Sequence, residues 1–253
     1  MQAVAERLKQ LTGCNFIKIL NSGDAAVLCS IYVAKRFKGK LQIPDQGGWL
    51  TYQKFPRIFD LDAEEIKTDF GLIRNCSGAV LFCNPAGYFA EQDLKLIRRK
   101  AELMIIDASG SIGRDTGSAD IVIGSFGFDK PVNLGYGGFF ATNNKDYYDC
   151  AKELFPAMQF SGDLDLLLKK LDNLKERYKM LEHYTMKIKQ ALAHLDIIHP
   201  NRWGINVVVR YNNENEREEI IDYCARHMFE YTECPRYIRV LTSAISIEVK
   251  RLE

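Results

Sequence analysis

The sequence has no apolar run of membrane-spanning length, and its first residues lack the charged and apolar regions of a signal peptide. Its 34 basic residues nearly cancel its 33 acidic ones, which leaves a formal net charge of +1. Such a chain has no excess of positive charge to attract nucleic acid or an acidic membrane. We therefore expect a cytoplasmic protein that binds neither nucleic acid nor a membrane.

The cysteines and histidines lack the spacing of a metal site. No two of the seven cysteines form a Cys-x-x-Cys pair, and the four histidines all fall in the C-terminal half without ligand spacing. Scattered thiols of this kind are typical of a chain kept reduced in the cytosol. We expect free cysteines and no bound metal.

The chain is long and apolar enough to bury a sizeable core. Of its 253 residues 47% are hydrophobic and 26% are charged, which suits one large domain and a smaller one. A break in the pattern at Ser161 and Gly162 divides the chain into a large domain, residues 1–160, and a C-terminal part, residues 161–253.

Short apolar runs alternate with amphipathic stretches over the first 150 residues. This alternation predicts an α/β fold, with a mostly parallel seven-stranded sheet and helices on both faces. A small C-terminal α+β domain follows. Helices are expected over residues 2–12, from 21 to about 35, 91–100 and from 143 to about 154. Strands are expected over 16–20, 41–44, 56–60, 78–83, in the runs that end at Asp107 and Ser125, and after the glycines near 138.

Polar or aromatic residues follow several of the expected strands. Ligands of open α/β sheets gather at the carboxyl ends of their strands. The residues in question are Ser22, Trp49, Asn84, Asp107 and Ser125. We therefore expect a binding site at this edge of the sheet.

The segment from Leu103 to Thr142 carries the most specific pattern. Asp107 ends one apolar run, and Ser125 ends the next. Lys130 follows that serine by five residues, and a glycine-rich stretch then leads into another apolar strand. Each feature alone is weak, and only their order and spacing are specific.

This order resembles the core of fold-type-I pyridoxal-phosphate enzymes, and is most similar to the DegT/DnrJ/StrS-type sugar aminotransferases in a shortened form. The resemblance implies that the cofactor is pyridoxal 5'-phosphate, with its Schiff base on Lys130. Asp107 would pair with the pyridine nitrogen, and Ser125 would contact the phosphate. Lysine can form an imine and move protons, while a carboxylate keeps the ring protonated as an electron sink.

The resemblance extends to other cofactor contacts. Ser22 and Gly23 correspond to the phosphate-binding junction, where Asp24 replaces the family's threonine. An aspartate there is also an ordinary helix N-cap, and we expect Asp24 to turn away from the phosphate and cap its helix. Trp49 resembles the aromatic ring that stacks on the cofactor, although a core tryptophan fits equally well. Ser109 is a candidate for the phenolic oxygen, because Gly110 replaces the family's usual glutamine.

Two residues are candidates for binding substrate. Asn84 opens an Asn-Pro-x-Gly-Tyr turn, which in the resembled family lies near cofactor and substrate. Arg239 falls on an expected C-terminal strand and suits a bidentate grip on a substrate carboxylate. A solvated arginine on an edge strand is the more common case.

The pattern of the C-terminal part predicts one long helix followed by a compact α+β unit. Apolar residues from Leu164 to Leu195 follow helical spacing, with an interruption at Thr185. We expect this helix to link the two domains. The expected elements beyond it are a strand over 203–211, a helix over 214–228, and one or two strands with a short helix over 237–248.

The leading hypothesis is an aminotransferase-like enzyme that acts on an amino acid or an amino/keto-sugar as a homodimer. One alternative is a lyase or desulfurase, in which Cys83 or Cys234 would be accessible and have a low pKa. Another is a non-catalytic relative that keeps the fold and the dimer. The short chain and Asp24 favour this last alternative. The family's Asn-x-Arg segment has no clear counterpart around residues 155–165, which bears on the substrate more than on the cofactor.

Overall fold

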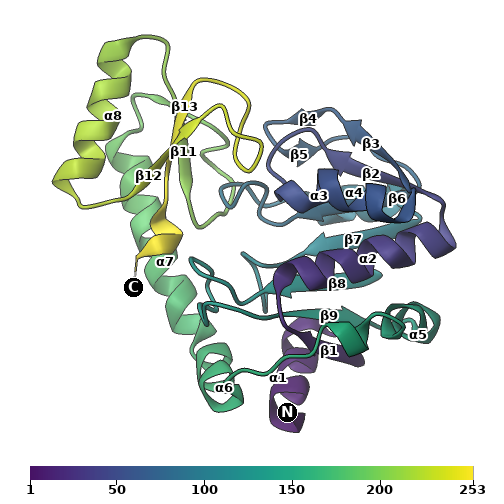
Figure 1. The fold of residues 1–253 in the computed structure, drawn as a ribbon. Coiled ribbons are helices and arrows are strands. Elements are labelled where there is room, and N and C mark those ends of the chain that lie inside the picture. Colours follow the sequence, from purple (N-terminus) through teal and green to yellow (C-terminus); the bar gives the residue numbers. More distant parts are fainter. Residues whose placement is uncertain (253) are drawn as a thin grey trace.

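The computed structural model describes residues 1–252, which form a large seven-stranded sheet with flanking helices and a smaller C-terminal sheet (Figure 1). The large sheet has the order β1-β9-β8-β7-β6-β2-β3. Its strands are β1 (Phe16–Leu20), β2 (Lys40–Pro44), β3 (Asp62–Ile66), β6 (Ala79–Cys83), β7 (Leu103–Asp107), β8 (Ile121–Ser125) and β9 (Gly138–Thr142). The pairs from β8 to β3 are parallel, and β9 pairs antiparallel with both β8 and β1. The predicted mostly parallel α/β fold is confirmed.

Helices cover both faces of the sheet, because its central strands are apolar on both sides. Along β7, Leu103 and Ile105 join the core beneath α2, whereas Met104 and Ile106 join the opposite core. The first face carries α2 (Gly23–Phe37), α3 (Leu50–Lys54) and α5 (Lys145–Lys152), and the second carries α1 (Gln2–Thr12), α4 (Leu94–Lys100) and α6 (Leu164–Asp172).

The strand expected over residues 56–60 is wrong. The segment is a 3₁₀ helix, η1 (Phe55–Phe59), with Pro56 in its first turn, where the missing N–H of proline costs nothing. The edge strand is instead β3, whose acidic sequence hides it from a search for apolar runs. Charged side chains are a common means of protecting a sheet edge from unwanted pairing.

The long linking helix is two helices. α6 ends at Asp172, and α7 (Leu174–Ala191) begins after Asn173, which has a ψ of 0°. One such residue bends the chain without shifting the apolar face, so Leu171 and Leu174 both stay buried. Thr185 does not break α7, because its hydroxyl donates to the carbonyl of Glu182 at 3.0 Å.

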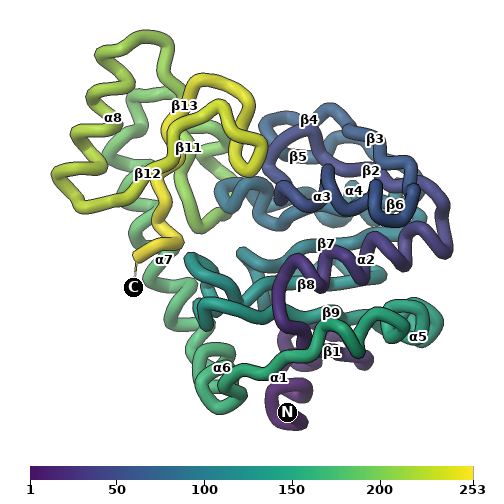
Figure 2. The backbone as a smooth tube through the Cα atoms, in the orientation of Figure 1, coloured from purple at the N-terminus to yellow at the C-terminus, as the bar shows by residue number. Residues whose placement is uncertain are grey.

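The C-terminal unit is an antiparallel four-stranded sheet that packs beside α7 (Figure 2). The expected strand over 203–211 is shorter, and the expected strand through Arg239 is wrong, because Arg239 lies in the turn before the last strand. The elements are β10 (Asp196–Ile197), β11 (Val207–Arg210), α8 (Glu214–Arg226), β12 (Tyr231–Cys234), β13 (Ala244–Ile247) and η3 (Val249–Arg251).

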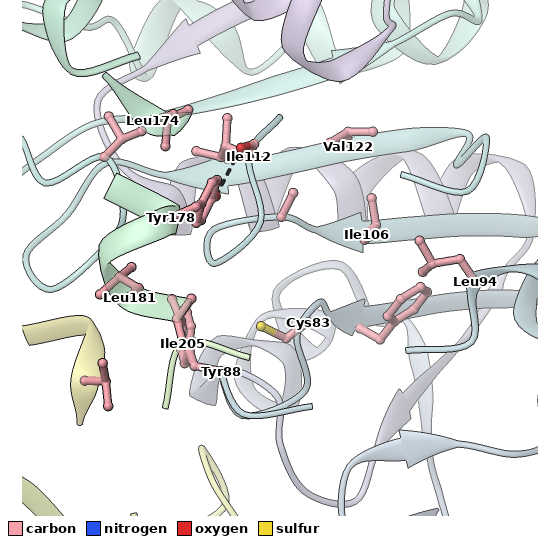
Figure 3. Packing of buried hydrophobic residues seen from close by; sticks show 14 of the residues in the cluster. Cys83, Tyr88, Leu94, Ile106, Ile112, Val122, Leu174, Tyr178, Leu181 and Ile205 are labelled. Carbon is pink, nitrogen blue, oxygen red and sulfur yellow. Dashed lines mark hydrogen bonds between the residues drawn. The ribbon is translucent and has the colours of Figure 1, made fainter. Parts of the chain in front are cut away.

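The two sheets share one continuous core. Tyr88, Tyr178 and Ile205 lie in the same buried cluster (Figure 3). The backbone carbonyl of Tyr88 accepts hydrogen bonds from the amides of Ile205 and Asn206, at 2.8 and 3.0 Å. The loop after β6 is therefore tied to the C-terminal unit.

The remaining short elements are β4 (Thr68–Asp69), β5 (Leu72–Ile73) and η2 (Phe155–Ala157).

Over residues 1–252, no helix combines the length and the apolar character needed to cross a membrane.

Candidate functional site

A cavity of about 360 Å³ lies where β7 and β8 end and α2 begins. Most of the site residues expected from the sequence come together around it. They are Ser22, Gly23, Asp24, Trp49, Asp107, Ser109, Ser125 and Lys130. Asn84 and Arg239 are not among the residues that line it.

Asp107 is the last residue of β7, and its carboxylate is fixed by two donors. The hydroxyl of Tyr52 donates to Oδ2 at 2.7 Å, and the amide of Ser109 donates to Oδ1 at 2.9 Å. Burial, together with the negative charge of Asp107, raises the pKa of Tyr52 well above its ordinary value. Tyr52 therefore stays a neutral donor. No pattern in the sequence predicts the role of Tyr52, which reaches Asp107 from α3.

Lys130 lies on the loop after β8, with its amine between two aromatic rings. Its Nζ is 5.5 Å from the ring centre of Trp49 and 4.8 Å from that of Tyr88. Burial lowers the pKa of Lys130, the charge of Asp107 opposes that shift, and the charge of Arg239 adds to it. A lowered pKa raises the fraction of neutral amine, which is the nucleophilic and proton-accepting form.

The first turn of α2 closes one side of the cavity. Gly23 approaches Ser125 so closely that a Cβ on the glycine would lie 2.6 Å from the serine Cβ. The leading amides of a helix have no acceptor within the helix, and its N-terminus favours negative charge. The glycine therefore brings these amides close to the end of β8.

Asp24 does not cap α2, contrary to the sequence prediction. Ser22 has the extended backbone of an N-cap, and its hydroxyl accepts the amide of Ala25 at 3.1 Å. Asp24 already lies inside the helix, where its Oδ1 accepts the indole N–H of Trp49 at 2.8 Å and the hydroxyl of Thr51 at 3.2 Å. Asp24 thereby fixes the orientation of the Trp49 ring.

The two serines link the ends of the neighbouring strands. The hydroxyl of Ser109 accepts the amide of Ser125 at 2.8 Å, and the hydroxyl of Ser125 accepts the amide of Gly127 at 3.1 Å. Gly110 has no room for a side chain, because its Cβ would lie 2.8 Å from the ring of Tyr88. Tyr88 thus packs directly against the position where the sequence has Gly110.

Asn84 lies behind the cavity wall. It is fully buried, its Oδ1 accepts the amide of Gln92 at 2.9 Å, and its carbonyl accepts the hydroxyl of Ser111 at 2.6 Å. Its Nδ2 has no hydrogen-bond partner within residues 1–252. These contacts order the loop that carries Tyr88.

Arg239 is buried and already paired with a carboxylate of the chain. Its Nε and one terminal nitrogen donate to the two oxygens of Glu248 at 2.8 and 2.6 Å. Burial alone would raise the pKa of Glu248, but Arg239 and Lys250 outweigh it and hold that pKa at about 2. No sequence pattern pointed to this pair.

The comparisons with known proteins agree with this architecture. Residues 175–253 match the model of the MJ1341 family C-terminal domain, and no curated protein matches the chain by sequence. The fold matches 3-amino-5-hydroxybenzoic acid synthase at a TM-score of 0.75 and 12% identity, covering 100% of this chain and 86% of that one.

Two further solved structures are similar. Helicobacter pylori PseC, described as an aminotransferase involved in the biosynthesis of pseudoaminic acid, matches at a TM-score of 0.71 and 12% identity, over 98% of this chain and 85% of that one. Bacillus subtilis NtdA, with bound cofactor PMP, matches at a TM-score of 0.69 and 12% identity, over 99% of this chain and 73% of that one. The resemblance found in the sequence is confirmed at the level of the fold.

Proposed function

We propose that the chain is a pyridoxal-phosphate-dependent, aminotransferase-like enzyme with its cofactor on Lys130. The main support is that Lys130 and the buried Asp107 line the same cavity as Gly23, at the start of α2, where the backbone closely approaches Ser125. The similarity to NtdA and PseC supports it.

The residues of the cavity fit this cofactor. Asp107 would hold the pyridine nitrogen, Ser22, Gly23 and Ser125 would hold the phosphate, and Trp49 would cover the ring. Because Gly23 has no side chain, the backbone at the start of α2 can lie close to Ser125, on the side of the cavity proposed to hold the phosphate. When bound, the cofactor supplies an electron sink for carbanion chemistry.

Lys130 is the residue suited to move protons. Its lowered pKa leaves more neutral amine near pH 7 to take a proton from a substrate carbon and return it. Asp107, oriented by Tyr52, provides the fixed negative charge. The rings of Trp49 and Tyr88 enclose the amine and limit its access to water.

The pairing of Arg239 bears on the substrate. Arg239 is buried outside the cavity lining, and its Nε and one terminal nitrogen already donate to the two oxygens of Glu248, so it is poorly placed to bind a substrate carboxylate. Of the two classes expected from the sequence, this favours an amino/keto-sugar over an amino acid as the substrate. Asn84 would act through the loop that it orders.

The alternatives have less support. The thiols of Cys83 and Cys234 are buried, and burial raises both pKa values, which does not suit a desulfurase. The short chain and Asp24 favour a non-catalytic relative, but the carboxylate of Asp24 already accepts hydrogen bonds from Trp49 and Thr51.

We propose further that the protein is a cytoplasmic homodimer with domains of residues 1–160 and 161–253. Seven free cysteines support a reducing compartment. Phe128 is 74% exposed on the cavity rim, beside the partly exposed Tyr136. Such aromatic rings are enriched at protein interfaces.

The proposed function is tested by loading the protein with pyridoxal phosphate and adding single amine donors. We expect an absorbance change with an amino-sugar, a weaker one with an α-amino acid, and none in Lys130→Met. Lys145→Met, which changes an exposed lysine that does not line the cavity, is the matched control and should behave as the wild type. Equal responses from the wild type and Lys130→Met would refute the proposal.

A further inference from the structure

Three basic side chains lie around the ring of Tyr88, and two of them, Arg239 and Lys250, are buried. Its centre lies 4.8 Å from the Nζ of Lys130, 5.3 Å from the guanidinium of Arg239 and 5.4 Å from the Nζ of Lys250. Lys130 and Tyr88 line the cavity, whereas Lys250 comes from η3, and its side chain is only 4% exposed. A second amine therefore lies just behind the cavity wall.

The two carboxylates near Lys250 also form ion pairs with arginines. Its Nζ is 3.5 Å from Glu248 Oε2, but both Glu248 oxygens already accept from Arg239. It is 4.0 Å from Asp129 Oδ2, which lies closer to the Nε of Arg251, at 3.3 Å. Lys250 is thus a buried ammonium group that shares both of these carboxylates with arginines, and its burial disfavours the charged form.

The surrounding groups act on Lys250 in opposite directions. Burial lowers its pKa most, Glu248 and Asp129 raise it, and Arg239 and Lys130 lower it, with a result of about 7. Among the other neighbours, burial raises the pKa of Tyr88 well above its ordinary value, so this ring is uncharged. From α7, Arg177 donates to the backbone carbonyl of Lys250 at 3.1 Å and fixes its position.

We propose that Lys250 is a second ionisable amine of the site, whose proton is coupled to the charge on Lys130 across the ring of Tyr88. When Lys130 loses its positive charge, Lys250 takes up a proton from solvent water, so the cationic charge around Tyr88 is retained. When Lys130 regains its charge, Lys250 releases that proton. The idea deepens the proposed function, because Lys130 has the covalent role there, but the coupling itself requires no cofactor.

The test is an NMR titration of the protein without added cofactor, with ¹³C at the lysine Cε atoms. The Lys250 signal is assigned as the one that disappears in Lys250→Arg. We expect it to titrate with a midpoint near 7, whereas ordinary exposed lysines titrate above about 10. Lys130→Met should raise this midpoint by about one pH unit, because it removes a positive charge held against the same ring.

Two controls separate coupling from a general loosening of the fold. Lys130→Arg keeps the charge and should leave the Lys250 midpoint within a few tenths of a unit of the wild type. Asp129→Asn, in a half-exposed loop, removes a negative charge 4.0 Å away and should shift the midpoint the opposite way, downward. A lysine with a purely structural role would not show a midpoint that rises in Lys130→Met and falls in Asp129→Asn.

A wild-type midpoint above about 9, or one that Lys130→Met leaves unchanged, would overturn the proposal. The titration does not depend on cofactor binding. A protein that binds no pyridoxal phosphate but shows the shift would refute the proposed function and leave the coupling in place.

Discussion

Asp24 lies in the first turn of α2 and lines the same cavity as Lys130. A negative charge here repels a phosphate, which itself carries nearly two negative charges at neutral pH. The hydrogen bonds from Trp49 and Thr51 hold one oxygen of Asp24 in place, so the residue orients the indole at the cost of anion affinity.

We predict that Asp24→Asn binds pyridoxal phosphate about tenfold more tightly than the wild type, since one unfavourable charge contact of about 1.4 kcal/mol is removed. The asparagine oxygen can still accept from Trp49, so stability should change little. Fluorescence titration measures the affinity. Asp163→Asn, at the N-cap of α6, is the control and should not alter it. Weaker binding by Asp24→Asn would show that the carboxylate helps to hold the cofactor.

At the scale of elements, the sequence predicts those that apolar periodicity defines. β1, α1, α2, β7 and β8 lie where the pattern places them, because each buries an apolar face or run. Apolar periodicity does not reveal β3, because its sequence is acidic, and it places Arg239 on a strand, although the apolar run around this residue forms a turn.

The same limit applies to the site. Eight of the residues that line the cavity follow strands or belong to the Ser125–Lys130 pattern, so the sequence predicts them, whereas it does not predict Tyr88, which also lines the cavity. Tyr52, Glu248 and Lys250 act through contacts with residues far away in the chain, such as Tyr52 with Asp107. Spacing along the sequence carries no signal of that kind.

Across the whole molecule, a buried charge cluster of the C-terminal unit contacts the loop that carries Tyr88, because the guanidinium of Arg239 lies 5.3 Å from the centre of that ring. Glu248 accepts from Arg239 and from the side-chain amide of Asn206 at 2.9 Å. Because the folded pKa of Glu248, about 2, is below its unfolded value, this carboxylate stabilises the fold above about pH 4.5 and loses that effect as the pH falls toward 2.

We predict that wild-type stability falls more steeply between pH 4.5 and 2 than that of Glu248→Gln, by on the order of 3 kcal/mol in the free energy of unfolding. At neutral pH the variant should be less stable, because Arg239 is then buried without its counter-charge. Urea unfolding across this range measures both effects. Other carboxylates titrate in both proteins, so the difference isolates Glu248. Parallel curves would contradict the assignment.

The proposed attachment of the cofactor to Lys130 can be tested by trapping the linkage chemically. The protein is incubated with pyridoxal phosphate, reduced with sodium borohydride, digested and mapped by mass spectrometry. We expect a single pyridoxyl-modified peptide with the added mass on Lys130. A label on another lysine, such as Lys250 or Lys145, or no label at all, would show that Lys130 does not carry the cofactor.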